Sequence, residues 1–381
     1  MPWSTRDTMS LRQEFVLLAQ QEGCNRRELC RRFGISPQTA YKWLARYAEL
    51  GTAGLADRPR RPEHSPMRTQ AELEQAVIAL RQQHPAWGGR KINRRLTDLG
   101  HVDAPAPSTV TSILHRHGWI APAASDAATP WQRFEHAEPN QLWQMDFKGD
   151  FALDGGRRCA PLTVLDDHSR FNVLLAACTC TQTQIVQGHL RAAFERYGLP
   201  LRINTDNGAP WGSPTEPGQL TRLGVWLIRL GVRLSYSRPA HPQTNGKDER
   251  FHRTLKTEAL AGRHFATCEA AQQALDAWRT VYNQERPHQA IGLATPITRY
   301  RPSPRRYPRT LPPIEYRPSD IVLSIGWNGE LRFRNRRFRV SSALHGLPVA
   351  LRHDPTQSDL YDLYFVHQHI GRIDLNQPDP R

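Results

Sequence analysis

Between Gln141 and Arg299 the hydrophobic pattern changes in a way that few folds accommodate. Three consecutive β-rich runs come first, and helical and β-rich runs then alternate. Short runs rich in β-branched and aromatic residues, bounded by turn residues, are typical of strands. The pattern predicts an α/β domain with three consecutive strands followed by αβαβ. The expected strands are 142–153, 159–165, 172–179, 202–205 and 232–236, and the expected helices are 182–197 and 218–230.

Two acids lie where these strands meet loops. Asp146 belongs to the first strand, in the run WQMDF, and Asp206 follows the fourth, in the run NTDNG. Adjacent strand ends can bring two carboxylates together, and like charges at short distance are tolerated mainly when a divalent cation neutralises them. The two positions therefore indicate a metal site.

A third acid, Glu249, lies on a helix that follows the loop 237–246. Glu249, Arg253 and Lys256 stand at i, i+4 and i+7, so they share one helix face. One acid and two cations on one face suit a site that binds both metal and a phosphodiester. The separate apolar stripe expected to face the core is Phe251, Leu255 and Ala259.

Other acids compete for this role. Asp166 and Asp167 have the composition of a hairpin turn, so we leave both out of the metal site, with assistance by either as the alternative. Asp248 shares a helix face with His252 and is expected to cap the first helical turn.

Further polar residues have two possible roles. His241 and Asn245, in the loop before the helix, either contact the target strand or leaving group, or shape the loop. For Arg286 and His288 we favour bracing of the core over phosphate binding.

The N-terminal segment has helical periodicity in three blocks, 11–21, 26–33 and 37–47. Gly34 supplies a tight turn, Ser36 is a good N-cap and Pro37 fits the first helical position, which together predict a helix-turn-helix. A generic three-helix bundle is the alternative. The residues expected to contact DNA in the major groove are Gln38, Thr39, Lys42 and Arg46, and the buried side is Ala40, Trp43 and Leu44.

A second helical unit is expected at 70–83, 90–99 and 108–117, again with the pattern of a helix-turn-helix. Two such units would let one protein read a longer DNA end than a single helix can.

Three segments, 57–68, 121–139 and 301–318, break the hydrophobic pattern and are interpreted as linkers. The first and third combine prolines with arginines, which suits extended chain lying on phosphates, although plain solvated linkers are equally consistent. A net charge of +15 makes nucleic acid the default partner, with a merely basic surface as the alternative. The linker residues expected to contact DNA are Arg58, Arg60 and Arg61.

The last segment, 320–375, is β-patterned and predicts a small β-barrel. His367 and His369 are interpreted as surface histidines, since no acid or thiol pair is expected near them. The arginines expected along one DNA-facing edge are Arg332, Arg334, Arg336 and Arg337.

The six cysteines contain no C-x-x-C pair and are expected to be reduced. We find neither a signal pattern nor an apolar run of about 18 residues, so the sequence predicts a soluble cytoplasmic protein without a membrane partner.

The order Asp146, Asp206, Glu249 resembles the D,D,E core of retroviral integrases and bacterial insertion-sequence transposases. Supporting motifs are WQMDF, TDNG, HPQTNGKDER and YNQERPH followed by Thr295-Pro296. The helix-turn-helix pair agrees with the insertion-sequence relatives, and the N-terminus lacks the His/Cys zinc site of retroviral integrases. The separation of Asp206 from Glu249 is longer than in the retroviral form, and the loop 211–218 is expected to hold the extra residues.

The resemblance implies a ribonuclease H-like core in a multidomain protein: helix-turn-helix domains at 1–56 and 69–120, the core at 140–300 and the barrel at 319–376. It implies a DNA transposase that binds the ends of a mobile element, cleaves the 3′ ends and joins them to target DNA. The three carboxylates would hold two Mg²⁺ ions, or Mn²⁺ in their place, about 3.5–4 Å apart. Double-stranded DNA, both terminal repeats and target, is the expected partner of at least a dimer, and the resemblance implies association with the bacterial nucleoid. The alternatives are a catalytically silent helix-turn-helix regulator and a ribonuclease H-like nuclease.

Overall fold

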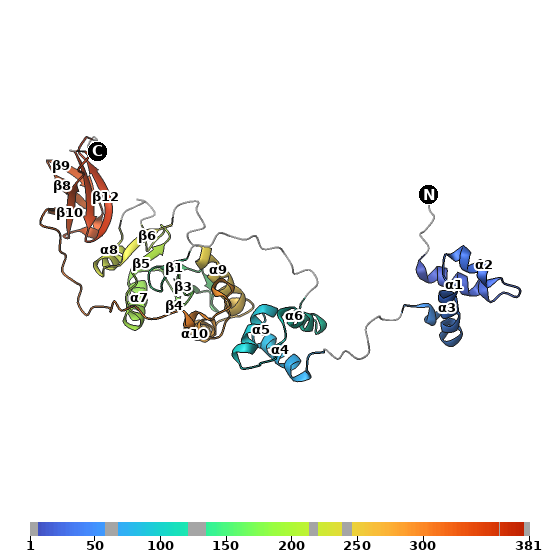
Figure 1. Cartoon of the computed structure of the whole chain (residues 1–381). Coiled ribbons are helices and arrows are strands. Elements are labelled where there is room, and N and C mark those ends of the chain that lie inside the picture. The colour runs from blue at the N-terminus through green and yellow to red at the C-terminus, as the bar shows by residue number, and fades with distance from the viewer. Residues whose placement is uncertain are drawn as a thin grey trace. The chain divides into compact units, whose positions relative to one another are not determined.

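The computed structural model describes residues 7–57, 68–120, 135–212, 220–237, 246–357 and 359–376. The chain divides into two compact units, Met1–Arg68 and Thr69–Arg381 (Figure 1). Within the described ranges, every helix is too short or too polar to traverse a bilayer.

The first unit is the expected three-helix arrangement, with α1 at Thr8–Ala19, α2 at Arg26–Phe33 and α3 at Pro37–Leu50. Gly34 ends α2 at φ 64°, a left-handed conformation that glycine adopts without strain. The Ser36 hydroxyl then caps α3 by accepting a hydrogen bond from the Thr39 backbone N–H at 3.2 Å. The glycine and serine of the predicted turn therefore have the roles expected from the sequence. The hydrophobic core of the first unit contains Phe15, Val16, Ala40, Trp43 and Leu55.

The second unit begins with three more helices, α4 at Ala71–Gln83, α5 at Gly89–Asp98 and α6 at Pro107–Arg116. Gly89 lets α5 approach α6, because a Cβ there would lie 2.3 Å from the Pro107 carbonyl oxygen. The second predicted helical unit is confirmed, and its fully buried residues include Val77, Ile92, Leu96 and Leu114.

A six-stranded sheet follows, with β2, β3, β1, β5 and β6 in that order and β4 paired to β3. β1 runs antiparallel to β3 and parallel to β5, so the first three long strands form a meander and the last two extend it in parallel. This is the expected ribonuclease H-like arrangement. The strands are β1 Trp143–Phe147, β2 Phe151–Ala152, β3 Arg158–Asp166, β4 Asn172–Cys178, β5 Arg202–Thr205 and β6 Arg233–Tyr236.

One strand prediction was wrong. The run 142–153 is two strands, β1 and β2, because residues 148–150 leave the sheet and Gly149 adopts φ 84°, which an extended strand cannot contain.

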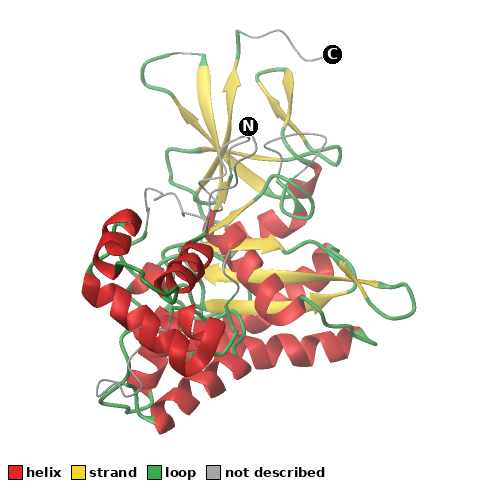
Figure 2. Ribbon diagram, turned by 90° about the vertical axis from the view of Figure 1, so that its right-hand side faces the viewer, coloured by secondary structure: helices red, strands yellow, loops and turns green. Residues whose placement is uncertain are grey.

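Helices cover the two faces of this sheet (Figure 2). Successive residues of a strand point to opposite faces. In β3, Val164 packs in one core cluster with residues of α7 (Thr183–Tyr197) and α8 (Arg222–Arg229). The next residue, Leu165, packs in another with residues of α9 (Gly246–Leu255) and α10 (Cys268–Gln284).

The C-terminal segment forms two separate sheets. The predicted closed barrel is not confirmed, since no pairing joins the order β12-β11-β10-β7 to the β8-β9 hairpin in the described residues. Arg334 and Asn335 both take positive φ, the conformation of a tight two-residue turn. This turn leads β8 directly back into β9, so the two strands pair with each other. The strands are β7 Ile321–Ser324, β8 Glu330–Phe333, β9 Arg336–Arg339, β10 Pro348–His353, β11 Leu360–Phe365 and β12 Gln368–Asp374.

The predicted arginine edge lies on the β8-β9 hairpin and the turn between its strands. Arg334 stands over the rings of Phe333 and Tyr361, and Arg336 donates to the Leu375 carbonyl oxygen. Contact of this edge with DNA stays a prediction. His369 is exposed as expected, but its Nε2 lies 3.2 Å from a carboxylate oxygen of Asp362, so the expectation of no nearby acid was wrong.

Candidate active site

Asp146 stands near the end of β1, on the face of the sheet that α9 covers. Its partner across the strand pair is Thr163 of β3, which is in contact with α9. The backbone N–H of Phe147 donates to Asp146 Oδ1 at 2.7 Å. Burial raises the pKa of Asp146 to about 6, and the negative charges of Asp206 and Glu249 add to that rise.

Asp206 and Glu249 therefore share an electrostatic neighbourhood with Asp146. Asp206 is the first residue after β5, the parallel neighbour of β1, and its Oδ1 accepts the backbone N–H of Gly208 at 3.1 Å. Glu249 lies in the first turn of α9. Both residues are exposed. In the described part of the chain, the carboxylate oxygens of Asp146, Asp206 and Glu249 are not all within 4.8 Å of one another.

Asp248 differs from the expectation of a capping residue. It is only 1 % exposed, and neither carboxylate oxygen has a hydrogen-bond partner among the described residues, so it caps no backbone N–H. The reason is its register: Asp248 lies three and seven positions before Phe251 and Leu255, on the stripe of α9 that faces the core. Burial and the charge of Asp146 raise the pKa of Asp248 well above its ordinary value.

His252 completes a tight cluster that the sequence did not bring out. Ligand atoms of Asp146, Asp248 and His252 all lie within 4.8 Å of one another. Thr163 links this cluster to the strand, because its hydroxyl donates to the Asp146 carbonyl oxygen at 2.9 Å and contacts His252 Nε2 at 2.8 Å. Burial lowers the pKa of His252 to about 4. The available signal was the i, i+4 spacing of Asp248 and His252.

The two acids after β3 have different roles. Asp166 shapes the turn, as expected, since its Oδ1 accepts the backbone N–H of Ser169 at 2.8 Å. Asp167 is 1 % exposed and joins three segments: it accepts from Lys247 of α9, from Gln144 Nε2 of β1 at 3.1 Å and from the backbone N–H of His136 at 3.0 Å. Asp167 therefore fastens the first turn of α9 to the strand that carries Asp146.

The two cations of the expected α9 face are both exposed. Arg253 lies on α9, but Lys256 begins a π-helical turn, Lys256–Leu260, so the α-helical spacing that aligned it with Glu249 ends at Leu255. Arg286 has the bracing role that we favoured, since it is buried and its Nε donates to Glu258 Oε1 at 3.0 Å. His288 is also buried.

The predicted DNA-reading side of α3 is accessible. Gln38 and Lys42 are exposed, and Thr39 and Arg46 are partly exposed. Lys42 and Arg46 lie over the ring of the buried Trp43, at 4.9 and 5.1 Å from its centroid. The remaining predicted contacts in the first linker and the loop, Arg58, Arg60, Arg61, His241 and Asn245, fall outside the described residues.

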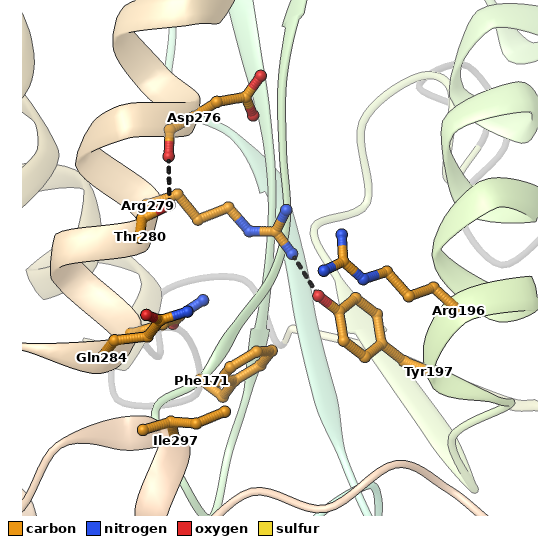
Figure 3. Close-up of a pocket in the computed structure, with 9 residues that line it drawn as sticks. Phe171, Arg196, Tyr197, Asp276, Arg279, Thr280, Gln284 and Ile297 are labelled. Atoms are coloured by element: carbon orange, nitrogen blue, oxygen red, sulfur yellow. Dashed lines mark hydrogen bonds between the residues drawn. The ribbon is translucent and has the colours of Figure 1, made fainter.

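A surface pocket of about 430 Å³ lies elsewhere, between α7 and α10 (Figure 3). The guanidinium of Arg279 points across it to the Tyr197 hydroxyl, at 3.2 Å, and also donates to the Asn172 carbonyl oxygen at 3.0 Å. Because Arg279 is engaged in holding α10 to β4 and α7, and because none of the three acids lines the pocket, we interpret it as a packing feature.

The chain matches known families in both of its parts. Residues 136–242 and 230–296 match two families described as Integrase core domain. Residues 11–63 match the family described as Helix-turn-helix domain, and residues 39–114 match the one described as Homeodomain-like domain. The matched residues thus form an integrase core preceded by helix-turn-helix domains.

Similar proteins come from mobile elements. An uncharacterised 31.7 kDa protein of insertion element IS407 from Burkholderia multivorans is 32% identical over 158 residues, which are 42% of this chain and 54% of that protein. The transposase of IS904 from Lactococcus lactis is 29% identical over 168 residues, 43% of this chain and 63% of that protein. The HTLV-2 integrase catalytic core, a solved structure with magnesium, is 18% identical with a TM-score of 0.33, covering 43% of this chain and 97% of that one.

The chain thus spans 54% and 63% of the lengths of these two relatives. Its domain matches, an integrase core after helix-turn-helix domains, and its similarity to proteins of insertion elements agree with one another.

Proposed function

We propose that this chain is a DNA transposase that binds the ends of a mobile element, cleaves their 3′ ends and joins them to target DNA. The observation that carries the proposal is the convergence of charge on Asp146, whose pKa is raised to about 6 by burial and by the carboxylates of Asp206 and Glu249. The three acids come from β1, from the residue directly after β5 and from the first turn of α9.

The donor set suits Mg²⁺, which prefers oxygen ligands and binds in proteins through a few carboxylates. Asp146, Asp206 and Glu249 would hold the two ions of the proposed site. Such ions activate the attacking hydroxyl or water and stabilise the leaving oxygen of a phosphodiester in line. The requirement for a cation also follows from the chain itself, since clustered carboxylates repel one another unless a cation or a proton intervenes.

The remaining residues orient the acids. The Phe147 and Gly208 backbone N–H groups hold one oxygen each of Asp146 and Asp206, and the second oxygen of each carboxylate would face an ion. The exposed cations Arg253 and Lys256, close to Glu249 in the chain, would bind the DNA backbone beside the acids.

Two ends must be brought together for joining, so we propose at least a dimer on DNA. A silent regulator would bind DNA without cutting it, and a ribonuclease H-like nuclease would cut without joining. An assay with Mg²⁺ and a labelled duplex carrying the element's end tests the proposal, because binding alone, cutting alone, and cutting followed by joining are distinct products. The proposal requires the third.

Recognition of the end should depend on α3. We expect Lys42→Gln with Arg46→Gln to weaken end binding about 10-fold or more, since a good contact to a base contributes about 1–3 kcal/mol. Metal-dependent nicking of nonspecific DNA should stay largely intact. A gel shift at physiological salt measures the binding.

The matched control for that variant is Arg222→Gln with Arg263→Gln, which removes the same charge from exposed positions outside the first unit. Unchanged end binding by the Lys42, Arg46 variant would remove α3 as the reading helix. Circular dichroism checks folding, because both cations lie over Trp43.

Positioning of α9 should depend on Lys247. We expect Lys247→Met to lower the unfolding free energy by about 3 kcal/mol, because it leaves Asp167 buried without its cation. It should also raise the Mg²⁺ concentration needed for half-maximal cleavage, as the first turn of α9 carries Glu249. Urea titration and a magnesium titration measure the two effects, and Lys247→Arg should restore both. Equal stability of Lys247→Met and wild type would contradict the role.

A further inference from the structure

The cluster of Asp146, Asp248 and His252 lies beside the proposed site but uses two residues that the proposed site does not. Its ligand atoms lie within 4.8 Å of one another, close enough for a single ion to reach all three. Asp248 and His252 are four positions apart on α9, a spacing that places both side chains on one helix face.

An independent observation points to a ligand here. Asp248 is almost completely buried, with an exposed fraction of 1 %, and both of its carboxylate oxygens lack a hydrogen-bond partner in the described part of the chain. An ionised carboxylate in this condition is costly, so it is neutralised by a proton or by a cation, such as a coordinated metal. The groups around Asp248 are Asp146 and Glu249, which carry the same charge, the Thr163 hydroxyl, and His252, whose Nε2 is 3.8 Å from Asp248 Oδ1.

We propose that Asp146, Asp248 and His252 form a second cation site that takes a first-row transition-metal ion in preference to Mg²⁺. The inference rests on the proposed function only in sharing Asp146 with the three-acid site. An imidazole nitrogen suits Zn²⁺ and other transition metals, whereas Mg²⁺ favours oxygen ligands and keeps several waters. A three-ligand set with one side open to solvent matches this class, because Asp146 is partly exposed.

The immediate surroundings are consistent with this use. If the ion binds His252 Nε2, it replaces the 2.8 Å hydrogen bond to Thr163, and the imidazole proton moves to Nδ1. The Thr163 hydroxyl keeps its bond to the Asp146 carbonyl oxygen, so the strand that carries Asp146 stays in register. An ion at this site would therefore bind Asp146, which the proposed reaction also needs, without disturbing the strand that carries it.

The test uses the full chain without a histidine tag and Mn²⁺ as the probe. Pulsed electron paramagnetic resonance detects a nitrogen bound directly to Mn²⁺. We expect this ¹⁴N coupling in wild type and in Asp206→Asn and Glu249→Gln, which leave the cluster intact. It should be lost in His252→Gln and kept in His264→Gln, the control at an exposed histidine. Zn²⁺ should displace the signal, and an excess of Mg²⁺ should not.

Asp248→Asn provides the second measurement. We expect its Mn²⁺ affinity for this site to fall by at least about 10-fold, the loss that outer partners of a metal alone can cause. The variant should fold, because Asn has the same shape and removes a buried charge, and circular dichroism checks this. A coupling that is absent in wild type, or that survives His252→Gln, would overturn the site.

The same samples separate this inference from the proposed function. If strand transfer is absent from wild type while the ¹⁴N coupling follows the expected pattern, the cation site stands and the transposase proposal fails. If strand transfer is present and the coupling is absent, the reverse holds. A coupling lost equally in Asp206→Asn, Glu249→Gln and His252→Gln would show one merged site and contradict a second one.

Discussion

Asp146→Asn and Asp206→Asn should each abolish cleavage and joining of DNA while leaving DNA affinity intact. Each substitution keeps the shape of the side chain and removes one of the charges that converge at the end of β1. Loss of metal-based charge stabilisation costs several kcal/mol, and about 1.4 kcal/mol corresponds to a tenfold change in rate. We therefore expect the rates of both steps to fall by at least about 1,000-fold.

Affinity should be kept or raised, because each substitution removes a proposed metal ligand and not a cation that would bind phosphate, and the repulsion of the DNA backbone falls when a carboxylate is removed. Gel shifts with the element's end and a Mg²⁺-dependent joining assay measure the two properties on the same preparation. Asp166→Asn is the matched control for effects on folding, because Asp166 shapes the turn after β3 and is not one of the proposed metal ligands. Substantial joining by Asp146→Asn or Asp206→Asn would remove that residue from the site.

The parts of the fold that local chemistry determines could be predicted from the sequence. The Gly34, Ser36, Pro37 turn is one example, because each residue acts through its own backbone preference or cap. The alternation from Trp143 to Tyr236 predicted the order of strands and helices, since sheet strands and covering helices have different periods. The break at Gly149 was missed because a single glycine in a strand pattern does not by itself reveal a positive φ.

The site was predicted less completely, because contacts across the sheet depend on register. Nothing in the order of residues shows that Thr163 is paired with Asp146, or that its hydroxyl reaches His252. The role of Asp167 was missed for the same reason: its partners Lys247 and Gln144 are brought to it by α9 and β1. The prediction of a C-terminal barrel was not confirmed for a different reason, since periodicity predicts strands but not whether their sheets close.

Substitutions of the two adjacent acids of α9 should have very different effects on strand transfer. We expect Glu249→Gln to eliminate Mg²⁺-dependent strand transfer, by at least about 1,000-fold on the same energetic argument as for Asp146. Glu249 is exposed and its charge acts on Asp146, so it can complete a site that is open to DNA. Successive residues of a helix point about 100° apart, which is why Asp248 is directed into the core instead.

Asp248→Asn is the matched control, one position away and with the same replacement of a carboxyl group by an amide. In Mg²⁺ alone it should keep strand transfer within a few-fold of wild type, because its carboxylate faces Asp146 and His252 inside the protein and not the DNA. Strand transfer by both variants, measured at identical metal and salt concentrations, decides between the two acids. If activity were lost in Asp248→Asn and kept in Glu249→Gln, the third acid of the site would be Asp248, and α9 would have to present its buried stripe to the metal.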